Sequence, residues 1–237
     1  MDFQRGTIYK TMTHTQESRI ALQPRDYGLL LGLLDARVMT IQHAALLHFG
    51  GSHEAAKKRL QKLQHAELVV QRPRRPQDPG VYSLARTGYL RLQEEGMLNP
   101  SVDGGWATIW KRLRVGDLML RHELSVMDVK AVVVSAVGAR PDLELVEMSV
   151  SPDCHSFRVT ECIAEAAGAV RFRSLIAKPD GFLHLRVKRE DSLPVEQFFF
   201  LEVDRGTESL GRLLRKAKHT TNSTGMGDLP CAGGSRA

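Results

Sequence analysis

The fold of this chain is predicted from two short stretches, KPDG at residues 178–181 and FFFLEVDRGTE at residues 198–208. Each stretch places acidic residues beside a segment with the composition of a β-strand. If the second strand continues through Glu202 and Asp204, both side chains point to one face. Asp180 precedes the neighbouring strand and is placed to join them. Clustered carboxylates beside an apolar run are costly unless something binds them, and Mg²⁺ is a common partner.

The size and composition of the chain predict a globular protein. Its 237 residues are enough for one large or two small domains, and 42% hydrophobic with 25% charged residues is ordinary. No apolar run is long enough to cross a bilayer, and the N-terminus lacks the apolar core of a signal peptide. Three cysteines without CxxC spacing argue against a disulfide framework or a cysteine zinc site. We therefore expect a cytoplasmic protein with no membrane partner.

The positive charge is concentrated in one segment. Residues 24–92 contain eleven Lys and Arg against five Asp and Glu, an excess of six, which equals the net charge of +6 of the whole chain. The remainder of the chain is therefore neutral. This distribution favours contact between the first half and a polyanion, and it is consistent with a nucleoid- or plasmid-associated protein.

Helix-start signals divide this basic segment into three short helices. The first begins near Pro24, where proline is tolerated in the first turn. Thr40 and Ser52 are placed to cap the second and third helices. The third helix, residues 53–65, has its alanine and leucines on one side and its lysines on the other, which is the pattern of a helix at a protein surface.

A β-hairpin is expected after the third helix. Residues 68–72 and 81–84 have strand composition, and the loop between them is rich in proline and carries arginines. A fourth helix begins at Thr87. Three helices followed by a hairpin with a basic tip predict a winged helix-turn-helix domain, which we assign to residues 20–95.

The basic helix and the hairpin are the predicted DNA-binding surface. An α-helix fits the major groove, where its polar face reaches base edges, while arginines on a hairpin tip reach phosphates or the minor groove. The expected DNA-binding residues are His53, Lys57, Lys58, Gln61, Lys62, Arg72, Arg74 and Arg75. Alone, such a charge run is typical of a solvated helix face, but the basic hairpin beside it favours DNA. A protein-binding winged helix is the main alternative.

The second half of the chain is predicted to form an α+β domain over residues 121–219, after a linker and helix over residues 96–120. Its first helix is expected over residues 122–136, with Leu124, Met127 and Val132 facing the core. By composition, strands are expected at residues 143–150, 157–163, 169–175, 182–187 and 198–203. A final helix is expected at residues 207–218.

This order of elements resembles the core of the PD-(D/E)xK nucleases. In that core a strand is entered through Pro-Asp, and the next strand ends in acid-x-lysine between two helices. The resemblance implies that Asp180, Glu202 and Asp204 hold Mg²⁺ as metal ligands and catalytic acids. Position 204 carries an acid where the resemblance calls for lysine, and Lys216 and Lys218 on the following helix are the candidate substitutes, with Lys216 the expected catalytic lysine.

The whole layout is similar to the replication-relaxation family. The motifs that carry the resemblance are HxLxVxD at residues 122–128, KPDG at 178–181, FLEVDRGTES at 200–209 and RKxK at 215–218. The matching stretch extends from about Leu22 to Lys218. The resemblance implies a protein of a bacterial plasmid or integrating element that acts at the initiation of replication. Its implied partners are double-stranded DNA and replication or transfer proteins of the same element.

The end of the chain departs from this resemblance. Related sequences continue into further apolar strands, whereas residues 220–237 are small and polar here. We therefore expect a disordered tail and a nuclease-like domain that is truncated at its C-terminus. A sheet that lacks one edge favours a homodimer through the exposed edge.

The leading functional hypothesis is a double-stranded DNA-binding protein that acts in the initiation or control of replication or transfer. A Mg²⁺-dependent DNA nuclease and a winged-helix transcriptional regulator are the alternatives. The acids also have structural explanations, because Pro-Asp-Gly is a common turn, Arg205 can pair with them and Glu208 suits a first helical turn. His122 is expected at a helix start or in a buried hydrogen bond. An enzyme is therefore the less favoured interpretation.

Overall fold

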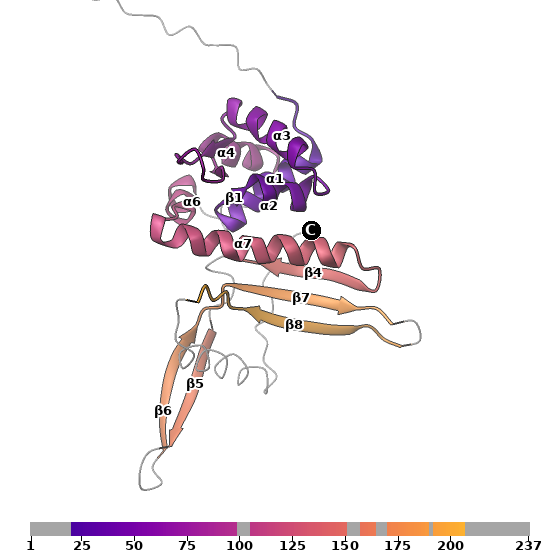
Figure 1. The fold of residues 1–237 in the computed structure, drawn as a ribbon. Helices are drawn as coiled ribbons and strands as arrows, with labels where there is room; N and C mark the ends of the chain where they lie inside the picture. Colours follow the sequence, from indigo (N-terminus) through magenta and orange to yellow (C-terminus); the bar gives the residue numbers. More distant parts are fainter. Residues whose placement is uncertain (1–19, 99–104, 151–156, 165–169, 190–191, 207–237) are drawn as a thin grey trace, which may run out of the picture.

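The computed structural model describes the chain over residues 20–98, 105–150, 157–164, 170–189 and 192–206. Helices dominate the N-terminal half and strands the C-terminal half, so the predicted α+β class is confirmed (Figure 1). The helix predicted over residues 207–218, with Lys216 on it, lies outside the described residues. The same holds for the tail predicted over residues 220–237.

The three predicted N-terminal helices are present with the expected starts. They are α1 (Pro24–Ala36), α2 (Ile41–His48) and α3 (His53–His65). The hydroxyl of Thr40 accepts a hydrogen bond from the backbone N–H of His43 at 3.2 Å. The hydroxyl of Ser52 accepts one from Ala55 at 3.4 Å. These oxygens satisfy backbone donors that have no partner inside the helix, which is why the helices begin there.

A small antiparallel sheet completes this unit. Its strands are β1 (Met39–Thr40), β2 (Val69–Gln71) and β3 (Val81–Leu84), in the order β1-β3-β2. Strands β2 and β3 form the predicted hairpin, with Val69 opposite Leu84. The sequence did not predict β1, because a two-residue strand shows no alternation and exists only through its pairing with β3.

Helix α4 (Arg86–Glu94) closes the core of the N-terminal unit over the leucines of α1 and α3. It approaches the sheet closely at Gly88, where a Cβ atom would lie 2.2 Å from the carbonyl oxygen of Leu68. Only glycine permits this approach. On the other side of the helix, the rings of Tyr89 and Trp106 lie 5.6 Å apart and join α4 to α6 (Trp106–Leu113).

Helix α7 (Asp117–Gly138) is the link between the two halves of the chain. It lies between the N-terminal helices and a sheet of β4 (Leu143–Ser149), β7 (Gly181–Val187) and β8 (Val195–Leu201) (Figure 1). This sheet is antiparallel in the order β4-β7-β8. Strands β5 (Phe157–Ala164) and β6 (Val170–Ala177) form a separate hairpin that points away from it.

The predicted inward face of α7 is partly wrong. Met127 is buried and Leu124 is half-buried, as expected, but Val132 is 61% exposed. Five residues separate Met127 from Val132, which turns an α-helix by about 140°. The helix packs against α2 and β4, and the side of the helix that carries Val132 is left to solvent.

His48 is a half-buried imidazole at the contact between α1 and α2. It faces Gly28 and Gly32, whose lack of side chains leaves room for the ring. Its Nε2 is buried and has no hydrogen-bond partner in the part of the chain that the structure describes. Burial lowers the pKa of His48 to about 4, and the charge of Lys130 adds to this effect. The ring is therefore neutral at pH 7.

We expect His48 to make the protein sensitive to acid. The unfolded chain binds a proton at this residue near pH 6.5, whereas the folded chain does so only near pH 4, so stability is lost between these values. At pH 4.5 the loss from this group alone is about 2–3 kcal/mol. Urea unfolding at pH 7 and pH 4.5 measures it, with His48→Leu as the variant that lacks the titrating group. Equal pH dependence in both proteins would contradict the assignment.

Candidate nucleic-acid interface and acid site

The outward face of α3 presents the predicted DNA-binding residues to solvent. Ala56, Leu60 and Leu63 are buried against α1 and α2, which turns the opposite side of the helix outward. The exposed residues of that side are His53, Lys57, Lys58, Gln61, Lys62 and His65. Lys58 lies 3.6 Å from Glu54, with both side chains largely in solvent. Among the described residues, Lys57 and Lys62 have no ion-pair partner.

The tip of the hairpin carries two exposed arginines. Arg74 folds back over the loop, where its Nη1 donates hydrogen bonds to the carbonyl oxygens of Pro76 at 3.0 Å and Asp78 at 2.7 Å. The backbone N–H of Arg75 contacts the carboxylate of Asp78 at 3.4 Å. Arg74 therefore shapes the tip, while the Arg75 side chain extends from it into solvent.

Arg72 has a different environment from the other predicted residues. Its Nη1 donates to the carbonyl oxygen of Val115 at 2.7 Å, and its Nη2 pairs closely with the carboxylate of Asp117 at the start of α7. Through these contacts, Arg72 connects the hairpin to the junction of α6 and α7. It is not brought together with the cations of α3.

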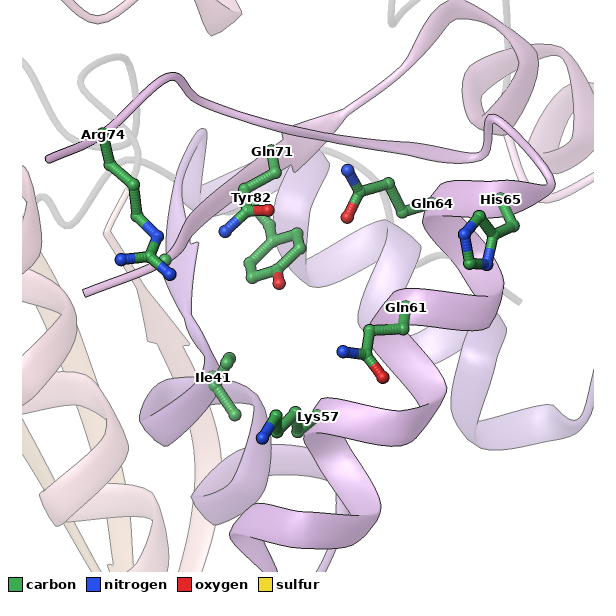
Figure 2. A pocket seen from close by; sticks show the side chains of 9 residues that line it. Ile41, Lys57, Gln61, Gln64, His65, Gln71, Arg74 and Tyr82 are labelled. Carbon is green, nitrogen blue, oxygen red and sulfur yellow. The ribbon is translucent and has the colours of Figure 1, made fainter. Parts of the chain in front are cut away.

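A polar pocket of about 320 Å³ separates α3 from the hairpin (Figure 2). The residues that line it are Ile41, Lys57, Gln61, Gln64, His65, Gln71, Arg74, Gly80 and Tyr82. A Cβ atom at Gly80 would lie 2.7 Å from the Gln71 amide nitrogen, so Gly80 and the movable end of Gln71 are close neighbours at the pocket wall. Burial raises the pKa of the Tyr82 hydroxyl and nearby Arg74 partly offsets that rise, so this group is a neutral hydrogen-bond donor at pH 7.

Four polar lining residues are absent from the predicted site: Gln64, His65, Gln71 and Tyr82. Gln64 follows Gln61 by three positions and so shares its face of α3. Gln71 and Tyr82 are direct partners across the hairpin, so their side chains share one face of the sheet. The register of the hairpin is the signal that would have identified them.

The two acids of the second motif lie beyond their strand. Strand β8 ends at Leu201, two residues earlier than predicted, so Glu202 and Asp204 belong to the segment after it. Both residues are exposed. One carboxylate oxygen of Asp204 accepts a hydrogen bond from the backbone of Gly206 at 3.0 Å, which is a local turn contact.

Asp180, the third acid, is held by the fold through both carboxylate oxygens. Oδ1 lies 2.9 Å from Nε2 of His122 on α7, and Oδ2 accepts a hydrogen bond from the backbone N–H of Val203 at 2.7 Å. The backbone N–H of Asp180 donates to the carbonyl oxygen of Leu201 at 2.8 Å. Asp180 therefore fastens α7 to the adjoining ends of β7 and β8.

The metal and catalytic assignments of these acids stay predictions. Among the described residues, no group of three or more His, Cys, Asp or Glu is arranged to hold a metal ion. Asp180 has its carboxylate engaged with His122 and the backbone, and Lys216 lies outside the described residues. The predicted hydrogen-bonding role of His122 is confirmed, whereas a place at the helix start is wrong because α7 begins at Asp117.

The other end of the HxLxVxD motif contacts the N-terminal unit. Oδ1 of Asp128 lies 2.7 Å from Nε2 of the buried His43 on α2. Nδ1 of His43 accepts a hydrogen bond from the backbone of Thr40 at 3.2 Å, so the proton is on Nε2 and is donated to Asp128. One motif on α7 thus contacts α2 at one end and the β7–β8 sheet at the other.

Two further ion pairs strengthen the contact between α7 and the N-terminal unit. Nζ of Lys130 lies 2.9 Å from the carboxylate of Asp35 on α1. Arg37 pairs closely with Glu123, and both of these side chains are largely buried. These pairs could not be predicted from local sequence patterns, because the partners are far apart along the chain.

These features define an α+β protein in which a basic helix-and-hairpin face is joined through one long helix to an antiparallel sheet. The chain belongs to the replication-relaxation family, whose model matches residues 30–220. Membership supports a role in the replication or transfer of a plasmid or other mobile element. The search of curated proteins and the search of solved structures found no significant match. None of the described helices has the length and apolar character needed to span a membrane.

Proposed function

We propose that residues 20–95 bind double-stranded DNA as a winged helix-turn-helix. The protein would do so in the initiation or control of replication or transfer of a bacterial plasmid or integrative element. One observation carries this proposal: Lys57 of α3 and Arg74 of the hairpin tip border the same polar pocket (Figure 2), and the other exposed cations of α3 and the tip lie beside it. Family membership supplies the biological setting.

The chemistry of this face matches the chemistry of duplex DNA. Lys57 and Lys62 are exposed without ion-pair partners among the described residues, so they are available to phosphates. Gln61 and Gln64 carry amides of the kind that pair with adenine in the major groove. A helix in the groove with Arg75 on the adjacent backbone is the arrangement of a winged helix on DNA. If the lysines of α3 were only a solvated helix face, a second basic element, the hairpin tip, would not be expected beside them.

Metal-dependent cleavage has no comparable support. Asp180 uses both carboxylate oxygens within the protein, and Glu202 and Asp204 follow the strand on an exposed segment. We assign Asp180 a structural role, as the residue through which α7 holds the sheet.

DNA binding should depend steeply on salt and on the α3 face. For a fluorescent duplex of mixed sequence, we expect the triple variant Lys57→Ala, Lys62→Ala, Arg75→Ala to lose affinity on the order of 100-fold near 100 mM salt. The slope of log affinity against log salt should fall by about three, since three phosphate contacts are removed. Arg74 is left in place because it shapes the hairpin tip. Fluorescence anisotropy between about 50 and about 200 mM NaCl measures both quantities.

A matched control separates this face from general positive charge. The triple variant Lys178→Ala, Arg121→Ala, Arg189→Ala also removes three exposed cations, but from outside the α3 face. It should keep nearly the affinity and salt slope of the unchanged protein. Equal losses in the two triple variants, or unchanged binding in the first, would refute the proposed interface.

A further inference from the structure

A second and larger hollow lies against the other face of the hairpin. Its volume is about 830 Å³, and it is bounded by β2, β3, α6 and the start of α7. Gln71 and Tyr82 border both hollows, but Val70 and Arg72 line only this one, and because side chains alternate along a strand they point away from the face on which the Gln71 side chain lies. This hollow, which we term the α6 groove, is therefore distinct from the proposed DNA-binding face.

The α6 groove presents apolar surface to solvent. Val70 is 50% exposed and Trp110 is 40% exposed, and both line the groove. Leu118 and Met119 follow the groove residue Asp117 and are also largely exposed, Leu118 at 93%. Exposed apolar side chains within a hollow are typical of a binding site.

The charged residues of the groove select the chemistry of its occupant. Arginines outnumber acids, and the charged lining residues are Arg72, Arg86, Arg114 and Asp117. Asp117, the single acid, is already paired with Arg72. Arg114 lies over the ring of Trp110 at 4.9 Å, which holds its charge at the groove. An occupant that matches this surface is apolar and negatively charged.

Charge also disfavours occupants that come from this chain. Residues 1–19 contain three basic and two acidic residues, and residues 207–237 contain five basic and two acidic residues. Both segments are net positive, as the groove is. A second copy of the protein would bring the same arginines face to face, which is unfavourable for a self-complementary contact.

We propose that the α6 groove docks a short apolar and acidic segment of a different protein. The segment places its apolar side chains against Trp106, Trp110 and Val70, and its carboxylates meet Arg86 and Arg114. The groove and the α3 face use opposite sides of the hairpin, so a partner and DNA can be held at the same time. The docking site does not depend on the proposed DNA binding.

The two tryptophans of the chain, Trp106 and Trp110, both line the groove, so their fluorescence reports directly on its occupancy. Phage-displayed random peptides of about twelve residues, selected on the full chain, are the probe. Selected sequences should be rich in Asp and Glu together with aromatic residues or leucine. A synthetic peptide of the consensus should change the tryptophan emission on titration.

Substitutions in the groove test where the peptide binds. Val70→Asp and Arg114→Glu should each weaken peptide binding on the order of tenfold or more, as expected for residues at the centre of a contact. Both side chains are well exposed, so the fold should tolerate the changes, which urea unfolding verifies. The α3 variant Lys57→Ala, Lys62→Ala should bind the peptide as the unchanged protein does, whatever its affinity for DNA.

Several results would overturn the proposal. One is a set of selected peptides without acidic enrichment, and another is peptide affinity that Val70→Asp and Arg114→Glu leave unchanged. A change of tryptophan emission on adding synthetic peptides of residues 1–19 or 207–237 would assign the groove to this chain itself. A dimer in solution that Val70→Asp dissociates would assign it to a second copy.

Discussion

Replacing Asp26 with alanine is expected to destabilise the N-terminal helices by about 3–5 kcal/mol, the usual effect of removing one partner of a buried ion pair. Asp26 is 0% exposed. Its two carboxylate oxygens accept hydrogen bonds from Nε of Arg59 at 2.8 Å and from Nη2 at 2.5 Å, and one also accepts from the backbone of Gln23 at 2.6 Å. The substitution leaves the largely buried Arg59 charge without its partner. It also removes the contact that fixes α3 on α1.

Urea unfolding followed by circular dichroism measures this loss. Glu54→Ala is the matched control, because it removes an acid from an exposed pair on α3, the helix that carries Arg59, and it should change stability by less than about 1 kcal/mol. The double variant Asp26→Leu, Arg59→Met should recover much of the stability, since the uncompensated charge is gone. Equal effects of Asp26→Ala and Glu54→Ala would show that the buried pair does not hold the two helices together.

Replacing Asp180 with alanine is expected to lower the free energy of unfolding by about 2 kcal/mol, with or without Mg²⁺. The change removes the acceptor for His122 and for the backbone N–H of Val203, and both groups are then left in a largely enclosed position. His122→Ala should have a similar effect. The double variant should lose less than the sum of the two, because the residues share one interaction.

The control for this experiment is Asp204→Ala, which removes an exposed acid of the second motif and should change stability by less than about 0.5 kcal/mol. Thermal unfolding with and without MgCl₂ distinguishes the structural role from a metal site. Stabilisation of the unchanged protein by Mg²⁺ that disappears in both Asp180→Ala and Glu202→Ala would support the metal site. It would contradict our assignment.

The sequence predicted the helices and strands well because their signals are local. The caps at Thr40 and Ser52, the amphipathic pattern of α3 and the strand composition around the hairpin each depend on neighbouring residues. The fit of α7 between two layers is not local, which is why Val132 was placed on the wrong side. Arg72 was grouped with the cations of α3 because nothing near it in sequence reveals the carbonyl of Val115.

The positions of the acidic residues were also hard to predict, because they depend on contacts between residues that are distant in sequence. Strand β8 ends where its partner strand β7 begins, because Leu201 is opposite Gly181. Pro179, two residues before Gly181, has no backbone N–H with which the ladder could continue. The positions of Glu202 and Asp204 thus depend on a strand about twenty residues earlier. The partners of the HxLxVxD motif are more distant still, at 58 residues for His122 with Asp180 and 85 residues for Asp128 with His43.

Helix α7 contacts the N-terminal unit at one end and the β7–β8 sheet at the other, and this decides where the protein can be cut into fragments. A fragment that stops at residue 95 would leave the buried His43 facing water in place of Asp128 and would strip Asp35 and Arg37 of their partners on α7. A piece that keeps these pairs and the whole of α7 ends at Gly138. An exchange of the proposed DNA-binding part between relatives should therefore include helix α7.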